Sequence, residues 1–125
     1  MKLLLIFLGG GLGSLTRHAL SLINTPTLPY GTLASNALSC FLLGILTAAY
    51  LSRPDSHHAV RWLLATGFCG GFSTFSTYIA ENYQIWNNRL PITTIFYLLG
   101  SIVIGWLFLA LGIGVWNRYL SHLLP

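Results

Sequence analysis

The chain has 125 residues, of which 6% are charged, and six Lys and Arg residues against two acids give it a net charge of +4. A soluble domain carries about 25% charged residues, so this composition excludes a water-facing surface, and the mean hydropathy of +0.71 indicates lipid as the natural solvent. The basic residues are scattered singly along the chain, which excludes a continuous basic surface for nucleic acid.

Four segments are long and apolar enough to cross a bilayer, since a helix needs about 20 residues to span the hydrocarbon core. Polar or turn-rich stretches separate them at residues 24–31, 52–58 and 87–91. We therefore expect an all-α membrane protein with four transmembrane helices in one domain, residues 1–125. The expected segments are residues 3–22, 32–51, 59–83 and 92–116.

The orientation of these segments follows from the basic residues, which are enriched in cytoplasmic loops. With the N-terminus inside, four basic residues are cytoplasmic (Lys2, Arg53, Arg61 and Arg118). Arg89 is then outside, and Arg17 lies in or at the outer end of the first helix. This bias is modest, so insertion in both orientations stays open. The expected location is the inner cell membrane, as a multi-pass protein.

The second segment contains one carboxamide, Asn36, deep within an apolar stretch. An amide in hydrocarbon is costly unless it is paired. Asn36 is therefore expected either to bridge two helices or to line a pathway.

The third segment is interrupted by an unusual stretch, residues 67–78, which contains three glycines and four hydroxyl side chains. Glycine costs about 1 kcal/mol relative to alanine inside a helix. One interpretation is a helix broken at membrane depth, with the freed backbone groups facing an ion or a lined cavity. The other is an intact helix whose hydroxyls bond to carbonyls of the preceding turn. Composition alone leaves both open.

The fourth segment places four small or polar residues at successive four-residue steps, namely Thr93, Tyr97, Ser101 and Gly105. The stripe fits either a polar pathway or a seam between two helices. The chain contains no Ser/His/Asp or Cys/His arrangement, and its two acids lie far apart in sequence. The protein is therefore not expected to be an enzyme.

Three motifs occur in order: Gly10-Gly-Leu-Gly-Ser-Leu-Thr-Arg17, Gly31-Thr-Leu-Ala-Ser-Asn36 with Phe41-Leu-Leu-Gly44, and Gly67-Phe-Cys-Gly-Gly-Phe-Ser-Thr-Phe-Ser-Thr-Tyr78. Together they resemble the Fluc (CrcB) fluoride channel family, over essentially the whole chain. The resemblance implies a fluoride-selective channel that exports the ion passively and protects the cell from its toxicity.

The resemblance also implies an assembly. Members are homodimers of four-helix subunits packed antiparallel in the lipid with dual topology, and the third helix is broken mid-membrane. The implied partners are fluoride and a second copy of the chain. A structural sodium ion is expected at the dimer centre, where backbone carbonyls of Gly70 and Ser73 would bind it.

The residues that the resemblance assigns to the pore are Asn36, Phe75, Thr77, Tyr78, Tyr97 and Ser101. Arg17 and Glu81 fall at further positions that are occupied alike in the family. Tyr78 departs from the family, which usually has Phe there, although a Tyr ring keeps the same edge.

Two other function classes are considered. A small multidrug-type proton-coupled exporter also has four short helices, but it would need an acid in the first segment, and the chain has none there. A non-transporting assembly factor would use the polar stripes only for packing. Solute flux in liposomes separates these classes.

Overall fold

The computed structural model describes residues 1–52 and 58–121, and every regular element within those ranges is helical. The elements in order are α1 (Lys2–Ser21), α2 (Tyr30–Ser52), α3 (His58–Val60), the π-helical η1 (Arg61–Cys69), α4 (Gly70–Phe72), α5 (Phe75–Asn87), α6 (Pro91–Val115) and the π-helical η2 (Trp116–Leu120). The expected all-α class is confirmed, and the four expected segments are helical except at the end of the first and at Ser73 and Thr74 within the third.

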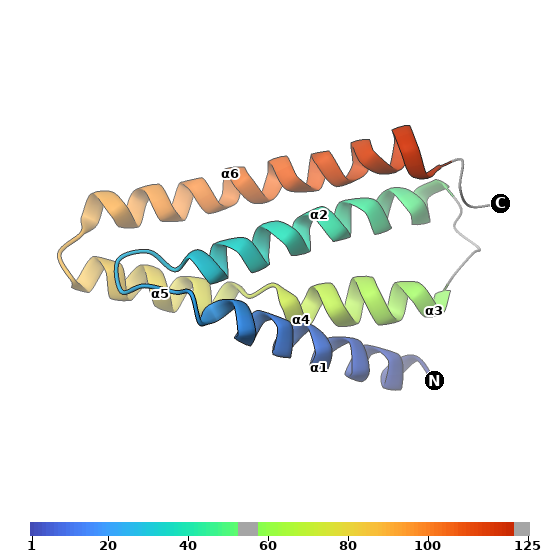
Figure 1. The fold of residues 1–125 in the computed structure, drawn as a ribbon, viewed down its shortest axis with the longest axis horizontal. Helices are drawn as coiled ribbons and strands as arrows, with labels where there is room; N and C mark the ends of the chain where they lie inside the picture. Colours follow the sequence, from blue (N-terminus) through green and yellow to red (C-terminus); the bar gives the residue numbers. More distant parts are fainter. Residues whose placement is uncertain (53–57, 122–125) are drawn as a thin grey trace.

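The helices lie side by side along one long axis (Figure 1). α1 packs against η1 and α4, and α2 packs against α6. The third expected segment is built from α3, η1, α4 and α5, which follow one another in the same direction along the bundle (Figure 1).

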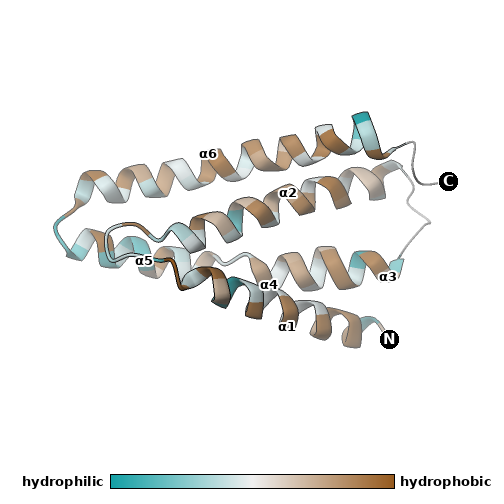
Figure 2. Ribbon diagram, viewed as in Figure 1, coloured by the Kyte–Doolittle hydropathy of each residue, from teal (hydrophilic) through white to brown (hydrophobic). Residues whose placement is uncertain are grey.

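Three helices of the described chain are long and apolar enough to cross a membrane, namely Lys2–Ser21, Tyr30–Ser52 and Pro91–Leu120. The third expected segment is not among them because it is divided into shorter helices, and it continues to Asn87 rather than ending at Tyr83. Most of α6 consists of hydrophobic residues, whereas the turn between α5 and α6 is hydrophilic (Figure 2).

Glycines allow the helices of each pair to approach closely. A Cβ at Gly13 would overlap the Phe68 carbonyl oxygen and lie 2.8 Å from the Phe72 amide nitrogen. Gly44 and Gly112 make the equivalent contact between α2 and α6, where a Cβ on either would overlap a carbonyl of the opposite helix. The small residues therefore determine which helix faces pack together.

The turn between α5 and α6 is closed by backbone hydrogen bonds. The Leu90 amide donates to the Ile85 carbonyl at 3.3 Å, and the Arg89 amide donates to the Trp86 carbonyl at 3.0 Å. This pair of bonds is a Schellman motif, which requires a left-handed residue after the helix. Arg89 fills that position with φ 59°. Pro91 then starts α6, where its missing amide hydrogen costs nothing.

The buried core lies at this end of the bundle and consists of Tyr78, Ile85 and Tyr97 with surrounding leucines. By contrast, many large apolar side chains are exposed on the surface of the subunit, including Phe7 and Phe96 at 75% each. Such an outer surface requires lipid or another protein chain to cover it.

Candidate functional site

The helical conformation stops after α4 and resumes at α5. Ser73 (φ −79°, ψ 157°) and Thr74 (φ −152°, ψ 124°) both have extended backbone. A continuous helix would bond each amide to the carbonyl four residues earlier. The interruption therefore frees backbone groups within an apolar bundle, where each needs another partner.

Asn36 of α2 provides one such partner. Its Oδ1 accepts a hydrogen bond from the Thr74 amide at 2.8 Å, and its Nδ2 donates to the Thr74 carbonyl at 3.2 Å. The Asn36 carboxamide thus satisfies both the amide and the carbonyl of Thr74, as the backbone of a neighbouring strand would. In a continuous helix the Thr74 amide would instead bond to the Gly70 carbonyl, which loses that donor here.

The carbonyls on either side of Gly70 are met by side chains of other helices. Ser39 donates to the Cys69 carbonyl at 2.9 Å, and Arg17 Nε donates to the Gly71 carbonyl at 3.1 Å. Ser73 adds its own hydroxyl to the Cys69 carbonyl at 2.9 Å. The expected site residues Arg17 and Asn36 are therefore brought to the same interruption from two different helices.

Gly70 itself lies on the open side of the subunit. The residue is exposed, and a Cβ built on it would meet no heavy atom within 4 Å. Ser73, the second residue expected at the sodium site, is half-buried beside it.

Thr74 also begins the helix that follows. Its Oγ1 accepts a hydrogen bond from the Thr77 amide at 3.3 Å and donates to the Thr77 hydroxyl at 3.0 Å. A threonine at this position is a favourable N-cap. Thr77, another expected site residue, is thus one helical turn from the interruption.

Three aromatic rings follow one another from α5 to α6. The rings of Phe75 and Tyr78 have centroids 6.1 Å apart, and those of Tyr78 and Tyr97 are 5.3 Å apart. Phe75 is 74% exposed, whereas Tyr78 and Tyr97 are 6% and 3% exposed. The Tyr78 hydroxyl donates to the Leu98 carbonyl at 2.6 Å. One ring of the expected pair therefore faces out of the subunit and the other faces into it.

Glu81 is the acid of this region and accepts three hydrogen bonds. Its Oε1 accepts from Asn24 Nδ2 at 3.0 Å and from the Thr32 hydroxyl at 2.6 Å, and its Oε2 accepts from the Tyr97 hydroxyl at 2.9 Å. Ser101, one turn further along α6, donates to the Tyr97 carbonyl at 2.6 Å. Glu81, Tyr97 and Ser101 thus form a polar region continuous with the Tyr78 ring.

Sequence reasoning did not identify Asn24, Thr32 or Asn82 as part of this region. Asn24 lies in a turn-rich connection, and Thr32 lies in the first turn of α2, so neither has a local signal for its partner 57 or 49 residues away. Asn82 donates to the Tyr78 carbonyl at 2.8 Å, and its buried Oδ1 accepts no hydrogen bond within the described part of the chain. Its position beside Glu81 in the sequence is the one signal available.

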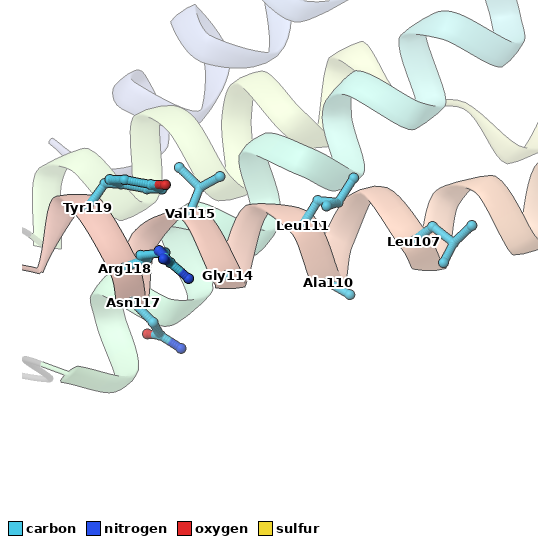
Figure 3. Close-up of a pocket in the computed structure, with 8 residues that line it drawn as sticks. All are labelled: Leu107, Ala110, Leu111, Gly114, Val115, Asn117, Arg118 and Tyr119. Atoms are coloured by element: carbon cyan, nitrogen blue, oxygen red, sulfur yellow. The ribbon is translucent and has the colours of Figure 1, made fainter.

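An open hollow of about 700 Å³ lies elsewhere, on the outer face of α6 and η2 (Figure 3). Leu107, Leu111 and Arg118 are among its lining residues, and none of the expected site residues contributes to it. The polar residues at the interruption are therefore the better candidate for an ion site.

Comparisons with known proteins identify the family to which the chain belongs. The family model for "CrcB-like protein, Camphor Resistance (CrcB)" matches residues 4–113. A protein of Phocaeicola vulgatus named "Fluoride-specific ion channel FluC" is 42% identical over 116 residues, which cover 90% of this chain and 95% of the relative. A protein of the same name from Hydrogenobaculum sp. is 38% identical over 127 residues and covers 99% and 100%.

A third relative, "Fluoride-specific ion channel FluC 1" of Staphylococcus aureus, is 36% identical over 114 residues, 90% of this chain and 94% of its own length. The matches span nearly the whole chain, including the interruption and the residues around it. The resemblance of the three motifs is thereby confirmed. The protein is a multi-pass membrane protein and a member of the CrcB (Fluc) family, which is a family of fluoride channels and not of enzymes.

Proposed function

We propose that this chain forms a fluoride-selective channel through which the ion leaves the cell passively, which protects the cell from fluoride. The observation that carries the proposal is the extended Ser73–Thr74 stretch, held by Asn36 and bordered by hydroxyl side chains. Fluoride is small and strongly hydrated, so a pore must replace its water with hydrogen-bond donors. Amide and hydroxyl groups are donors of this kind, and no net charge is required.

The pore residues are Asn36, Phe75, Thr77, Tyr78, Tyr97 and Ser101. Asn36 uses one Nδ2 hydrogen on the Thr74 carbonyl, and a carboxamide nitrogen has a second one to offer an anion. Aromatic ring edges carry partial positive charge and can also face an anion. The outward Phe75 ring and the inward Tyr78 ring then contribute to the path from opposite sides of the subunit surface.

The assembly is an antiparallel homodimer of dual topology, with the interruption of the third helix at the middle of the membrane. The exposed Gly70, with open space beyond it, supports a second chain at this face. Two oppositely inserted chains would bring their interruptions to the same depth.

The residues at this face fit a structural sodium ion. Hard cations prefer oxygen ligands, and the Gly70 carbonyl lacks the donor that a continuous helix would give it. Carbonyls of Gly70 and Ser73 from two chains would hold the ion. The bound ion supplies fixed positive charge, which favours anions nearby.

Fluoride efflux from liposomes tests the proposal. Purified protein is reconstituted into vesicles loaded with potassium fluoride, and a fluoride electrode records release after addition of a potassium ionophore. We expect rapid release that needs no proton gradient, and far slower chloride release in matched vesicles. Efflux that requires a proton gradient, or equal rates for both halides, would exclude a passive fluoride-selective channel.

A further inference from the structure

Asn24, in the connection between α1 and α2, uses its whole hydrogen-bonding capacity. Its Oδ1 accepts from the amides of Gly31 at 2.7 Å and Thr32 at 3.2 Å. Its Nδ2 donates to the Thr32 hydroxyl at 3.1 Å and to Glu81 Oε1 at 3.0 Å. A carboxamide has two donor hydrogens and an oxygen with two lone pairs, so each is engaged. The two amides also fix which end of the carboxamide faces Glu81.

The position of Asn24 is fixed independently of Glu81. The start of α2 lies directly against the end of α1, since a Cβ on Gly31 would overlap the Leu20 carbonyl and lie 2.9 Å from Asn24 Oδ1. The oxygen end of the Asn24 carboxamide is therefore anchored to backbone, and its nitrogen end is presented to α5. Glu81 is thereby tied to α2 through a side chain that is itself rigidly held.

The other donors on Glu81 differ from Asn24 in one respect. The hydroxyls of Thr32 and Tyr97 each have a single hydrogen, and both hydrogens point at the Glu81 carboxylate. A hydroxyl that turns its hydrogen to a passing anion must release Glu81. The Asn24 bond is made by Nδ2 of a carboxamide whose oxygen is held by two backbone amides, so this donor does not need to turn.

We propose that Asn24 is a positioning residue of the pore. It holds the Glu81 carboxylate in place while the Tyr97 hydroxyl turns its hydrogen bond from Glu81 to fluoride and back. A carboxylate in an apolar bundle is costly without donors. Asn24 keeps donating a hydrogen bond to the Glu81 carboxylate while Tyr97 changes its acceptor. The negative charge therefore stays in place and hydrogen-bonded beside the ion path. The inference rests on the proposed function, because it needs Tyr97 to face the pore.

A donor–acceptor swap tests this role. Asn24→Asp retains the oxygen that accepts from Gly31 and Thr32 but places a second carboxylate against Glu81. We expect fluoride efflux to fall by about tenfold, within the range of coupling between residues in contact. In Glu81→Gln protein the same substitution restores a donor–acceptor pair, with the donor now on α5. There, Asn24→Asp should change efflux by less than about twofold.

Thr25→Ala is the matched control, because Thr25 bonds the Leu28 backbone in the same connection and does not contact Glu81. Its efflux should equal that of wild type. Equal losses from Asn24→Asp in both backgrounds, or no loss in either, would overturn the inference while wild-type conduction keeps the proposed function intact. Wild-type protein that carries no fluoride would overturn both.

Thermal unfolding of the dimer, measured by size-exclusion chromatography after heating, compares the same single and double variants without a transport assay. It decides the case in which Asn24→Asp is too unstable for transport measurements or Glu81→Gln does not conduct. We expect the double variant to be more stable than Asn24→Asp alone. A double variant that is no more stable would show that Asn24 and Glu81 are not coupled and would overturn the inference.

Discussion

At the scale of single residues, Asn36 has a structural role as well as a proposed one in the pore. It meets both backbone groups of Thr74, so any change at Asn36 alters the interruption and the path together. Both protein stability and fluoride transport therefore have to be measured for any substitution of Asn36. Ser39, one turn along α2, offers a comparison because it also donates to backbone near the interruption, at the Cys69 carbonyl.

Asn36→Asp should abolish fluoride efflux and lower the stability of the protein by about 1–3 kcal/mol, because a carboxylate cannot donate to the Thr74 carbonyl. Ser39→Ala should cost about 1 kcal/mol and retain efflux, since the Cys69 carbonyl keeps its bonds from Ser73. Electrode efflux and thermal unfolding measure the two effects. Unchanged efflux in Asn36→Asp protein would remove Asn36 from the pore.

Phe75 can be tested without disturbing the core, because its ring is 74% exposed. Phe75→Ile should slow fluoride efflux by about tenfold or more through loss of the ring edge, with little change in unfolding. Phe7→Ile, at an equally exposed ring on α1, is the control and should leave efflux unchanged. Phe72 is unsuitable because it is buried and stacks on Phe68. Equal rates in the two variants would show that Phe75 does not face the ion.

At the scale of helices, backbone-to-backbone approach at glycines positions the interruption. α1 touches α4 closely at Gly13 and Gly71, and this contact brings Arg17 to the Gly71 carbonyl. The packing of α1 against α4 thus determines whether the Gly71 carbonyl receives its hydrogen bond from Arg17.

Gly13→Ala should destabilise the protein by about 1–3 kcal/mol, because the added methyl group meets backbone atoms that cannot move aside. Gly11→Ala, on the same helix with nothing within 4 Å, should be neutral or stabilising by up to about 1 kcal/mol. Thermal unfolding in detergent compares them. If both variants unfold alike, α1 does not pack on α4 as described.

Much of the helical layout was predictable from the sequence, because span length and hydropathy depend on local composition. α1 and α6 begin and end within a few residues of expectation. The continuation of α5 beyond Tyr83 to Asn87 was not predicted, since polar residues there resemble the start of a loop. The partners of Asn24 and Asn36 were not predictable, because the distances that join them arise only when separate helices pack.

At the scale of the whole molecule, one subunit leaves a large apolar surface uncovered, and its exposed Gly70 face supports a second chain. The modest charge bias leaves insertion in both orientations open. Residues 53–57, in the loop expected to report orientation, lie outside the described residues, and the described residues at its two ends, Ser52 and His58, are exposed.

A single cysteine introduced as His58→Cys, in protein without Cys40 and Cys69, should react with impermeant label from both sides of the membrane in comparable amounts. Dual topology requires this result, because half of the chains expose the loop on each side. Reaction from one side alone would indicate a fixed orientation, and the antiparallel partner would then have to be a different chain.

The most direct measurement of the central claim is the reversal potential of current through the reconstituted protein, with opposed gradients of fluoride and chloride across a planar bilayer. A passive fluoride-selective channel predicts reversal at the fluoride equilibrium potential, with no shift when the pH differs across the bilayer. Reversal at the chloride potential, reversal that follows the proton gradient, or no current above the protein-free bilayer would contradict it.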